Sequence, residues 1–211
     1  MILGDGQLAT AIRENVGDVD WTWIAYDAEY GRAEQVLQLA RPFLEELPDD
    51  AHVVISSQVP VGTCARFEAE FPGLCFCVVP ENIRVASGVE DFKSQDRIVV
   101  GARDVAKVGP VVGVLEQFTE QILFMSPESA EMSKSALNGF LALSIAYANE
   151  IARLCEQHGA DPEKVALAMM TDGRIGARAY LKPGPLPNEN LLREVANLTD
   201  LGGGPLIQAI R

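Results

Sequence analysis

The sequence is poor in the residues that hold metals or form disulfide frameworks. It has two histidines and four cysteines among 211 residues, and no spacing among them matches a set of metal ligands. Cys75 and Cys77 alternate with Phe76 in a predicted strand. Cys64 and Cys155 lie in predicted helices, which is typical of buried, reduced thiols. We therefore expect no bound metal, no disulfide framework and a cytoplasmic location.

Basic residues are also scarce. Seventeen lysines and arginines face 30 aspartates and glutamates, which gives a formal charge of −13. This charge disfavours nucleic acid and anionic membrane as partners. The most apolar run, 136–148, is interrupted by Asn138 and is too short to span a bilayer. The N-terminus runs directly into a predicted strand, so we expect no signal peptide and no membrane association.

What the chain does have is a regular alternation of apolar strands and amphipathic helices. Such alternation predicts a parallel sheet that is covered by helices on both faces. Strands are predicted at 1–3, 21–26, 51–57, 74–79, 97–100 and 121–125, and helices at 7–15, 31–47, 61–71 and 105–118. After these come a long helix at 126–159, a shorter one to about residue 170, a glycine- and proline-rich loop at 171–187, and a helix at 188–201.

A glycine turn follows the first predicted strand. Gly4, Gly6 and Ala9 match the G-x-G-x-x-G/A spacing, in which the glycines let a dinucleotide pyrophosphate approach a helix N-terminus. Gln7 lies in the same turn. The alternative is a plain tight turn between strand and helix, because the first strand is very short and we expect no acid at the end of a second strand some 20 residues on to hold a ribose.

The stretch 126–159 organises the rest of the chain. Ser126, Pro127 and Glu128 provide a cap, a proline at the first helical position and an acid at the positive helix end, and Gly159 provides the stop. A helix of about 32 residues is roughly 48 Å long, which exceeds the width of a domain of this size. Its apolar residues cover more than one face, so we expect it to form a homodimer.

Four stretches in fixed order resemble the UDP-glucose/GDP-mannose dehydrogenase family, and the resemblance covers most of the chain from Trp21 onward. The block around Lys134 and Asn138 is its most specific part. The stretches are SSQVPVGT (56–63), PENIRVASGVEDFKSQDRIVVG (80–101), EMSKSALNGFLALSIAYANEIARLCEQHGAD (131–161) and DGRIGARAYLKPG (172–184).

The resemblance implies an α/β fold. A reduced Rossmann-like NAD-binding domain at 1–125 would be followed by the all-α central dimerisation domain at 126–211, with the family's C-terminal sugar-nucleotide domain absent. It also implies NAD or NADP as cofactor, with binding that has been lost in one interpretation, and a sugar or nucleotide sugar as small-molecule ligand. In the family, a sugar C6 alcohol is oxidised to a carboxylate in two NAD-dependent steps.

The resemblance assigns roles to individual residues. Lys134 and Asn138 would hold the reacting oxygen and a water, and Glu81 matches the first acid of the P-E-F-L-R-E motif. An ammonium and an amide donor are suited to stabilising an alkoxide-like oxygen. Arg84 and Arg174, the latter in the R-I-G loop, would bind substrate. Ser57 and Gln58 would join the glycine turn at the cofactor.

The sequence departs from the family where the nucleophile is expected. The G-G-x-C-x-P-K-D segment is replaced by PGPLPNENLLREV, with Asn190 near the cysteine position and Arg193 and Glu194 near the lysine and aspartate. Asparagine cannot form a thiohemiacetal, so the four-electron reaction is expected to be absent. Val85 replaces the second glutamate of P-E-F-L-R-E, and Gln58 replaces a threonine.

The nucleotide-binding half is shortened as well. Only five residues separate Asn15 from the strand at Trp21, which leaves no room for the second and third strands of a Rossmann half. Two functions therefore remain open. One is an NAD(P)-dependent alcohol or aldehyde oxidoreductase that performs at most one two-electron step. The other is a non-catalytic relative, a pseudoenzyme that acts as a dimeric scaffold or as a ligand-binding or regulatory partner.

Overall fold

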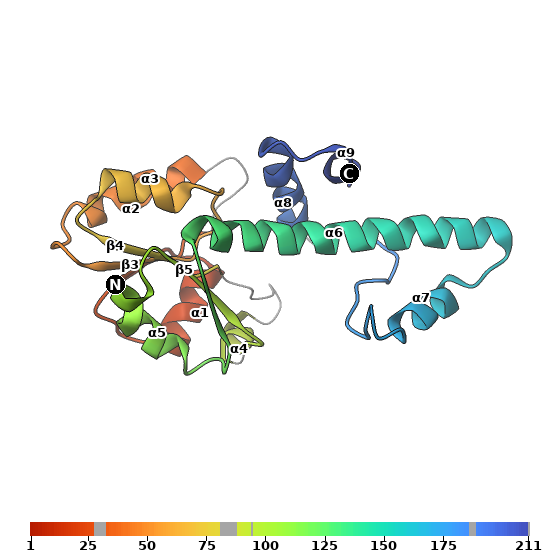
Figure 1. Cartoon of the computed structure of the whole chain (residues 1–211), viewed down its shortest axis with the longest axis horizontal. Helices are drawn as coiled ribbons and strands as arrows, with labels where there is room; N and C mark the ends of the chain where they lie inside the picture. Colours follow the sequence, from red (N-terminus) through yellow and green to blue (C-terminus); the bar gives the residue numbers. More distant parts are fainter. Residues whose placement is uncertain (28–32, 81–87, 94, 186–188, 211) are drawn as a thin grey trace. The chain divides into compact units, whose positions relative to one another are not determined.

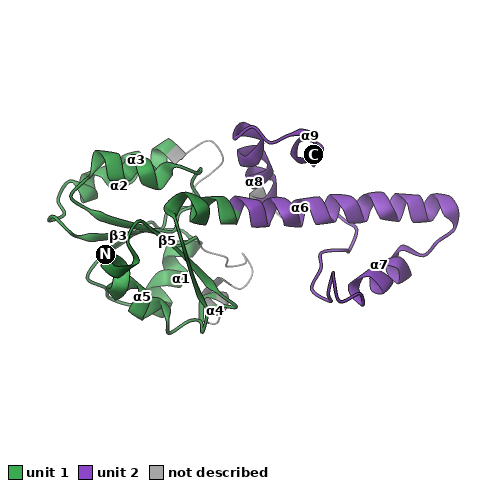
Figure 2. Cartoon of the chain, in the orientation of Figure 1, with its two compact units in different colours: residues 1–134 green, residues 135–211 purple. Residues whose placement is uncertain are grey.

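The computed structural model describes residues 1–27, 33–80, 88–93, 95–185 and 189–210, and shows a mixed α/β protein with a six-stranded sheet and a long helix (Figure 1). Two compact units, Met1–Lys134 and Ser135–Arg211, divide within this helix (Figure 2), whereas the expected domain boundary at 125/126 precedes it. The elements are β1 (Ile2–Leu3), α1 (Gln7–Val16), β2 (Thr22–Ile24), α2 (Ala33–Leu44), β3 (His52–Ile55), α3 (Thr63–Glu70), β4 (Cys75–Val78), α4 (Gly88–Lys93), β5 (Ile98–Ala102), the 3-10 helix η1 (Val105–Val108), α5 (Gly109–Leu115), β6 (Ile122–Met125), α6 (Pro127–His158), α7 (Pro162–Met170), α8 (Glu189–Asp200) and α9 (Pro205–Gln208).

The strands lie in the sheet in the order in which they occur in the chain, from β1 to β6. β1 to β4 are parallel, and β5 and β6 are parallel to each other. β5 runs antiparallel to β4, so the prediction of a wholly parallel sheet is wrong at this one pair. Alternating strands and helices predict a parallel sheet only if each connection returns to the same end of the sheet. Apolar content alone does not reveal where one connection fails to do so.

The helices of unit 1 cover both faces of the sheet, as expected (Figure 1). Side chains of α1, α4 and α5 pack on one face around Trp23, Val54 and Val100. Those of α2 and α3, together with Ala130 of α6, pack on the other face around Ile24 and Val53. The sheet is thus buried on both sides, which explains why its strands read as nearly continuous apolar runs.

The connection from β1 to β2 has the opposite hand to the two that follow it. β1, β2, β3 and β4 are successive parallel neighbours, yet α1 covers one face whereas α2 and α3 cover the other. Crossovers between parallel strands are right-handed in about 98% of cases, so β1–α1–β2 is the exception. A doubly wound sheet has the strand order 3-2-1-4-5-6, and removal of its second and third strands leaves this arrangement. The prediction that these two strands are missing is confirmed.

This loss leaves β1 at the edge of the described sheet, and Arg13 of α1 covers that edge. The carbonyl groups of Met1 and Leu3 accept hydrogen bonds from β2 and the residue after it. The carbonyl groups of Ile2 and Gly4 point the other way and accept from the Arg13 guanidinium, at 3.1 Å for Ile2. A buried or half-buried edge needs such partners because unpaired backbone groups are costly.

α6 begins where the sequence predicts. The Ser126 hydroxyl accepts a hydrogen bond from the backbone N–H of Ser129 at 3.2 Å. Gly101 of β5 allows the first turn to approach the sheet, because a Cβ at this position would lie 2.5 Å from that of Ala130. The far end stops at Gly159, which has the left-handed conformation (φ +69°) that favours glycine.

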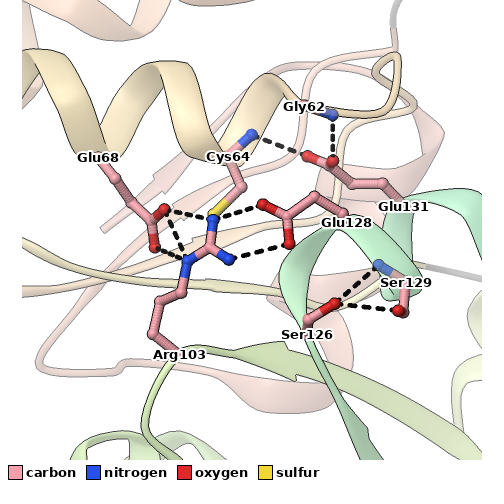
Figure 3. A network of polar contacts seen from close by, with 8 residues as sticks. All are labelled: Gly62, Cys64, Glu68, Arg103, Ser126, Glu128, Ser129 and Glu131. Carbon is pink, nitrogen blue, oxygen red and sulfur yellow. Dashed lines mark hydrogen bonds and ion pairs between the residues drawn. The ribbon is translucent and has the colours of Figure 1, made fainter.

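A polar network fixes the first turns of α6 to the sheet domain (Figure 3). Arg103, which follows β5, donates to Glu128 of α6 (Nη1 to Oε2, 2.9 Å) and to Glu68 of α3 (Nη2 to Oε2, 2.8 Å). Glu131, one turn further along α6, accepts from the backbone N–H groups of Gly62 (2.6 Å) and Cys64 (2.8 Å) at the start of α3. The buried Glu131 carboxylate thus caps a helix N-terminus.

Replacing Arg103 by alanine is expected to lower the free energy of unfolding by about 1 kcal/mol at neutral pH, because two carboxylates lose a shared partner that is half exposed. Arg103 lowers the pKa of the Glu128 carboxyl through its hydrogen bonds. The stabilisation is therefore present above the unfolded-state pKa of glutamate and is lost as the pH falls through the lowered pKa of Glu128. Urea unfolding of wild type and variant over a range of acidic pH measures both effects.

Arg66→Ala serves as the control, because Arg66 forms a single exposed pair with Glu34 and is expected to contribute less than about 0.5 kcal/mol. If the two alanine variants lost the same stability with the same pH dependence, the Arg103 network would not be what anchors α6.

Candidate functional site

The predicted cofactor residues lie at the carboxyl ends of β1, β2 and β3. Gly4 follows β1 with φ +129°, and a Cβ there would lie 2.4 Å from the carbonyl oxygen of Ala25. Gly6 is the N-cap of α1 and has no side chain to cap the helix. Ala9 is fully buried against the sheet. Because the helices after β1 and β2 cover opposite faces, the ends of these neighbouring strands form a topological switch point, the position at which α/β proteins bind ligands.

Asp27 lies at this switch point, and the residue was not among those predicted from the sequence. Its Oδ2 atom accepts a hydrogen bond from the backbone N–H of Gln7 at 2.9 Å. The statement that no acid follows a second strand is wrong, since Asp27 comes three residues after β2 and about 20 residues after the glycine turn. That spacing was the signal that could have found it. The carboxylate, however, lies at the N-terminus of α1, where a phosphate group would bind, and not where it would hold a ribose.

Ser57 is held beside the same loop, just after β3. Its hydroxyl accepts a hydrogen bond from the backbone N–H of Tyr26 at 2.8 Å, and Gln58 next to it is half-buried. The pKa of the Tyr26 hydroxyl is raised, first by burial and then by the negative charge of Asp5. The structure thus brings Gly4, Gly6, Gln7 and Ser57 together, but in an acidic setting.

These residues do not fit a dinucleotide cofactor. The amide at the start of α1 that would bind a pyrophosphate already has the Asp27 carboxylate as its acceptor. A Cβ on Gly6 would lie 1.9 Å from Asp27 Oδ2, so the space that the glycine opens is filled by the chain itself. The described sheet also has no strand beyond β1 to carry a ribose-binding acid.

Lys134 and Asn138, the predicted catalytic pair, lie four positions apart on α6. Lys134 is half-buried and is the last residue of unit 1, while Asn138 is buried and belongs to unit 2. Side chains four apart on a helix lie on one face. Glu81 and Arg84, the other predicted residues of this region, lie outside the described residues.

In unit 2, α8 places a buried carboxylate against α6. Glu194 is only 2% exposed, and its Oε2 atom accepts hydrogen bonds from the Ser135 hydroxyl at 2.7 Å and from the Asn197 amide at 3.3 Å. Gly139 permits this close packing, because a Cβ there would lie 2.5 Å from Leu198 Cδ1. Glu194, which stands near the position of the family aspartate in the resemblance, therefore joins two helices.

Arg174, the predicted substrate-binding arginine, is paired within its own turn. Its guanidinium donates to Asp172, at 2.7 Å between Nη2 and Oδ2, and its side chain is largely exposed. This pairing raises the pKa of Arg174 and lowers that of Asp172. Within the described residues, the pair lies apart from the buried cluster of Ser135 and Glu194.

The loop after α7 borders an open pocket in unit 2. Its volume is about 670 Å³, and it is lined by Ile145 of α6, by Glu163, Ala166 and Met170 of α7, and by residues 177–185. Arg178 and Lys182 contribute cationic groups to an otherwise mostly apolar lining. Asn149 of α6 fixes the end of the loop, because its side-chain amide accepts from the backbone N–H of Gly184 (2.7 Å) and donates to its carbonyl (2.9 Å). No role was predicted for Asn149 from the sequence.

Two further properties concern only the part of the chain that the structure describes. No group of three or more histidine, cysteine, aspartate or glutamate side chains is arranged to hold a metal ion. None of the described helices combines the length and the apolar character needed to cross a membrane.

Comparison with known proteins relates the chain to one family. Residues 128–201 match the model of the UDP-glucose/GDP-mannose dehydrogenase family, central domain. The chain is 33% identical over 194 residues to the UDP-glucose 6-dehydrogenase YwqF of Bacillus subtilis. The matched region covers 85% of this chain and 44% of the relative. It is 37% identical over 163 residues to the UDP-glucose 6-dehydrogenase of Rhizobium meliloti, which covers 71% of this chain and 37% of the relative.

Solved structures agree. A UDP-glucose dehydrogenase from the archaeon Pyrobaculum islandicum superposes with a TM-score of 0.79 at 30% identity, over 94% of this chain and 50% of that one. A UDP-D-ManNAc dehydrogenase from Pyrococcus horikoshii has the same TM-score at 18% identity, over 93% of this chain and 50% of that one, which supports the fold alone. The chain spans half or less of the length of these relatives.

The variant Asn149→Ala tests whether the hydrogen bonds between Asn149 and Gly184 hold the loop after α7 in place. It removes two hydrogen bonds to Gly184, and we expect local opening of the loop to become easier by about 1 kcal/mol, which corresponds to about fivefold faster cleavage after Arg178 by trypsin. Gln157→Ala, at another exposed position of α6, is the control and should be cleaved like wild type. Equal cleavage rates for the two variants would show that Asn149 does not hold the loop.

Proposed function

The chain belongs to the UDP-glucose/GDP-mannose dehydrogenase family, and we propose that it is a non-catalytic member that acts as a dimeric scaffold or ligand-binding partner. The single observation that carries this proposal is the state of Glu194. The carboxylate that stands near the aspartate of the family's G-G-x-C-x-P-K-D segment is buried between α6 and α8, and its Oε2 atom accepts hydrogen bonds from Ser135 and Asn197. A general base must reach the proton it removes, either directly or through one water.

The cysteines support the same proposal. Cys64, Cys77 and Cys155 are buried, and burial raises the pKa of Cys77 to about 12 and that of Cys64 as well. A thiol in this state has almost no reactive thiolate at neutral pH. No cysteine occurs after Cys155 in the sequence, whereas the family nucleophile follows the R-I-G loop in the resemblance.

A second candidate function is favoured by Lys134 and Asn138. Their spacing along one helix is the arrangement that the resemblance assigns to the reacting oxygen, and an NAD(P)-dependent alcohol or aldehyde oxidoreductase limited to one two-electron step would need these two side chains. The cavity bounded by residues 177–185, with Arg178 and Lys182, has a size suited to a sugar or nucleotide-sugar ligand under either proposal.

An assay with UDP-glucose distinguishes the non-catalytic function from the two-electron oxidoreductase. The purified chain, mixed with UDP-glucose and either NAD⁺ or NADP⁺, is expected to produce no reduced nicotinamide above the level seen with the Lys134→Ala variant, because no cysteine follows the R-I-G loop and the Glu194 carboxylate is buried. Turnover by wild type that Lys134→Ala abolishes would overturn the non-catalytic proposal and support the second.

The proposed partner is a second copy of the chain, bound along α6. Phe140, Tyr147 and Leu154 are spaced by seven residues on this helix and are 65%, 48% and 38% exposed. Spacing by seven places them on one stripe, and an apolar stripe of this kind is typical of a helix that packs against another helix. A two-fold arrangement would bring the stripes of both copies together.

Replacing Phe140 and Tyr147 by glutamate is expected to convert a dimer into a monomer at micromolar concentration, because four charges would be buried in the paired stripes. Light scattering after size exclusion gives the mass. Leu206→Glu alters an equally exposed leucine on α9, outside the stripe, and Lys134→Ala alters the candidate catalytic lysine; both should remain dimeric. A wild-type chain with the mass of a monomer would contradict the proposed assembly.

A further inference from the structure

The N-terminus of α1 has an acceptor from a distant part of the chain. The first amides of a helix lack partners within the helix and form its positive end, so they attract an anion. Gly6, the N-cap, offers no side chain for this purpose. Asp27 approaches from the loop after β2, and its Oδ2 atom lies 2.9 Å from the Gln7 nitrogen. The group that fills the place of a phosphate is therefore a carboxylate of the protein itself.

Contacts within the chain also explain both glycines of the turn. A side chain at Gly6 would collide with the Asp27 carboxylate, at 1.9 Å from Oδ2 and 2.5 Å from Cγ. A side chain at Gly4 would collide with backbone, at 2.4 Å from the carbonyl oxygen of Ala25. Gly4 is needed for β1 and the end of β2 to approach each other, and Gly6 leaves room for the Asp27 carboxylate. Their presence thus requires no ligand.

The charges around the turn oppose a second anion. Asp5 lies between the two glycines, and its charge contributes to the raised pKa of the nearby Tyr26. Arg13, the cation on α1 closest in sequence to the turn, donates to the carbonyl groups of Ile2 and Gly4. A pyrophosphate would have to enter beside Asp5 and displace Asp27, and with two like charges nearby the Coulomb energy is unfavourable.

We infer that Asp27 is a built-in anion that closes the α1 N-terminus to phosphate groups, so that the glycine turn is a structural joint between β1 and β2 and not a dinucleotide cradle. This inference goes beyond the proposed function. It concerns only the glycine turn at the N-terminus of α1, and it holds whether the chain acts as a scaffold or binds a ligand in unit 2.

Thermal unfolding with inorganic pyrophosphate tests the inference. Wild type, Asp27→Ala and the charge-matched control Asp18→Ala, whose aspartate is exposed beyond the end of α1, are compared with and without millimolar pyrophosphate at constant ionic strength. Asp27→Ala is expected to melt a few degrees lower than the other two, and pyrophosphate is expected to restore part of this loss in that variant only. The inference would be overturned if pyrophosphate raised the melting temperature of wild type as much as that of Asp27→Ala. It would also be overturned if the melting temperature of Asp27→Ala were neither lower than that of wild type nor raised by pyrophosphate.

A double-mutant cycle provides a second measurement. Gly6→Ala should destabilise wild type, and it should cost clearly less in the Asp27→Ala background, because the atom that clashes has been removed. Equal costs in both backgrounds would show that Asp27 does not occupy the space next to Gly6. If Asp27→Ala does not fold, Asp27→Asn keeps an acceptor oxygen for Gln7 and removes the charge, and the pyrophosphate comparison decides the question with that variant. These readouts do not involve UDP-glucose turnover, so their failure is distinguishable from failure of the proposed function.

Discussion

The direct pairing of β1 with β2 is the constraint on which the sheet-containing unit of this protein depends. In a doubly wound sheet, the first strand has neighbours on both sides. Here its only described neighbour is β2, and α1 remains on the face opposite to α2 and α3. The result is a crossover of the rare hand and a first strand at the sheet edge. Both consequences follow from one absence, that of two strands between α1 and β2.

The absence of these strands leaves backbone groups of β1 and α1 that need hydrogen-bond partners, and side chains of the protein itself provide them. The Arg13 guanidinium takes the carbonyl groups that would otherwise face a missing strand. The Asp27 carboxylate takes the amide that would otherwise face a phosphate. The edge of β1 and the N-terminus of α1 are therefore closed by contacts that stabilise the fold. These contacts are the physical basis for inferring that the glycine turn has a structural role.

The central domain is preserved to a greater degree than the nucleotide-binding half. Its long helix is continuous over 32 residues, is capped where the sequence indicates, and is anchored by Arg103 and Glu131. Against it, Glu194 of α8 is buried and accepts a hydrogen bond from the Ser135 hydroxyl. The match to the family's central domain covers this helix and extends over residues 128–201.

The sequence by itself determined most of the elements of secondary structure and the ends of α6, because apolar periodicity, Ser126, Pro127 and Gly159 act locally, but it did not predict α4. It also determined that two strands are missing, because five residues between Asn15 and Trp21 cannot form them. Only the tertiary structure decided the reversed direction of β5, the burial of Glu194 and the contact between Asp27 and Gln7. Each of these depends on which distant segments meet, and spacing along the chain cannot tell an aspartate that caps a helix from one that would bind a ribose.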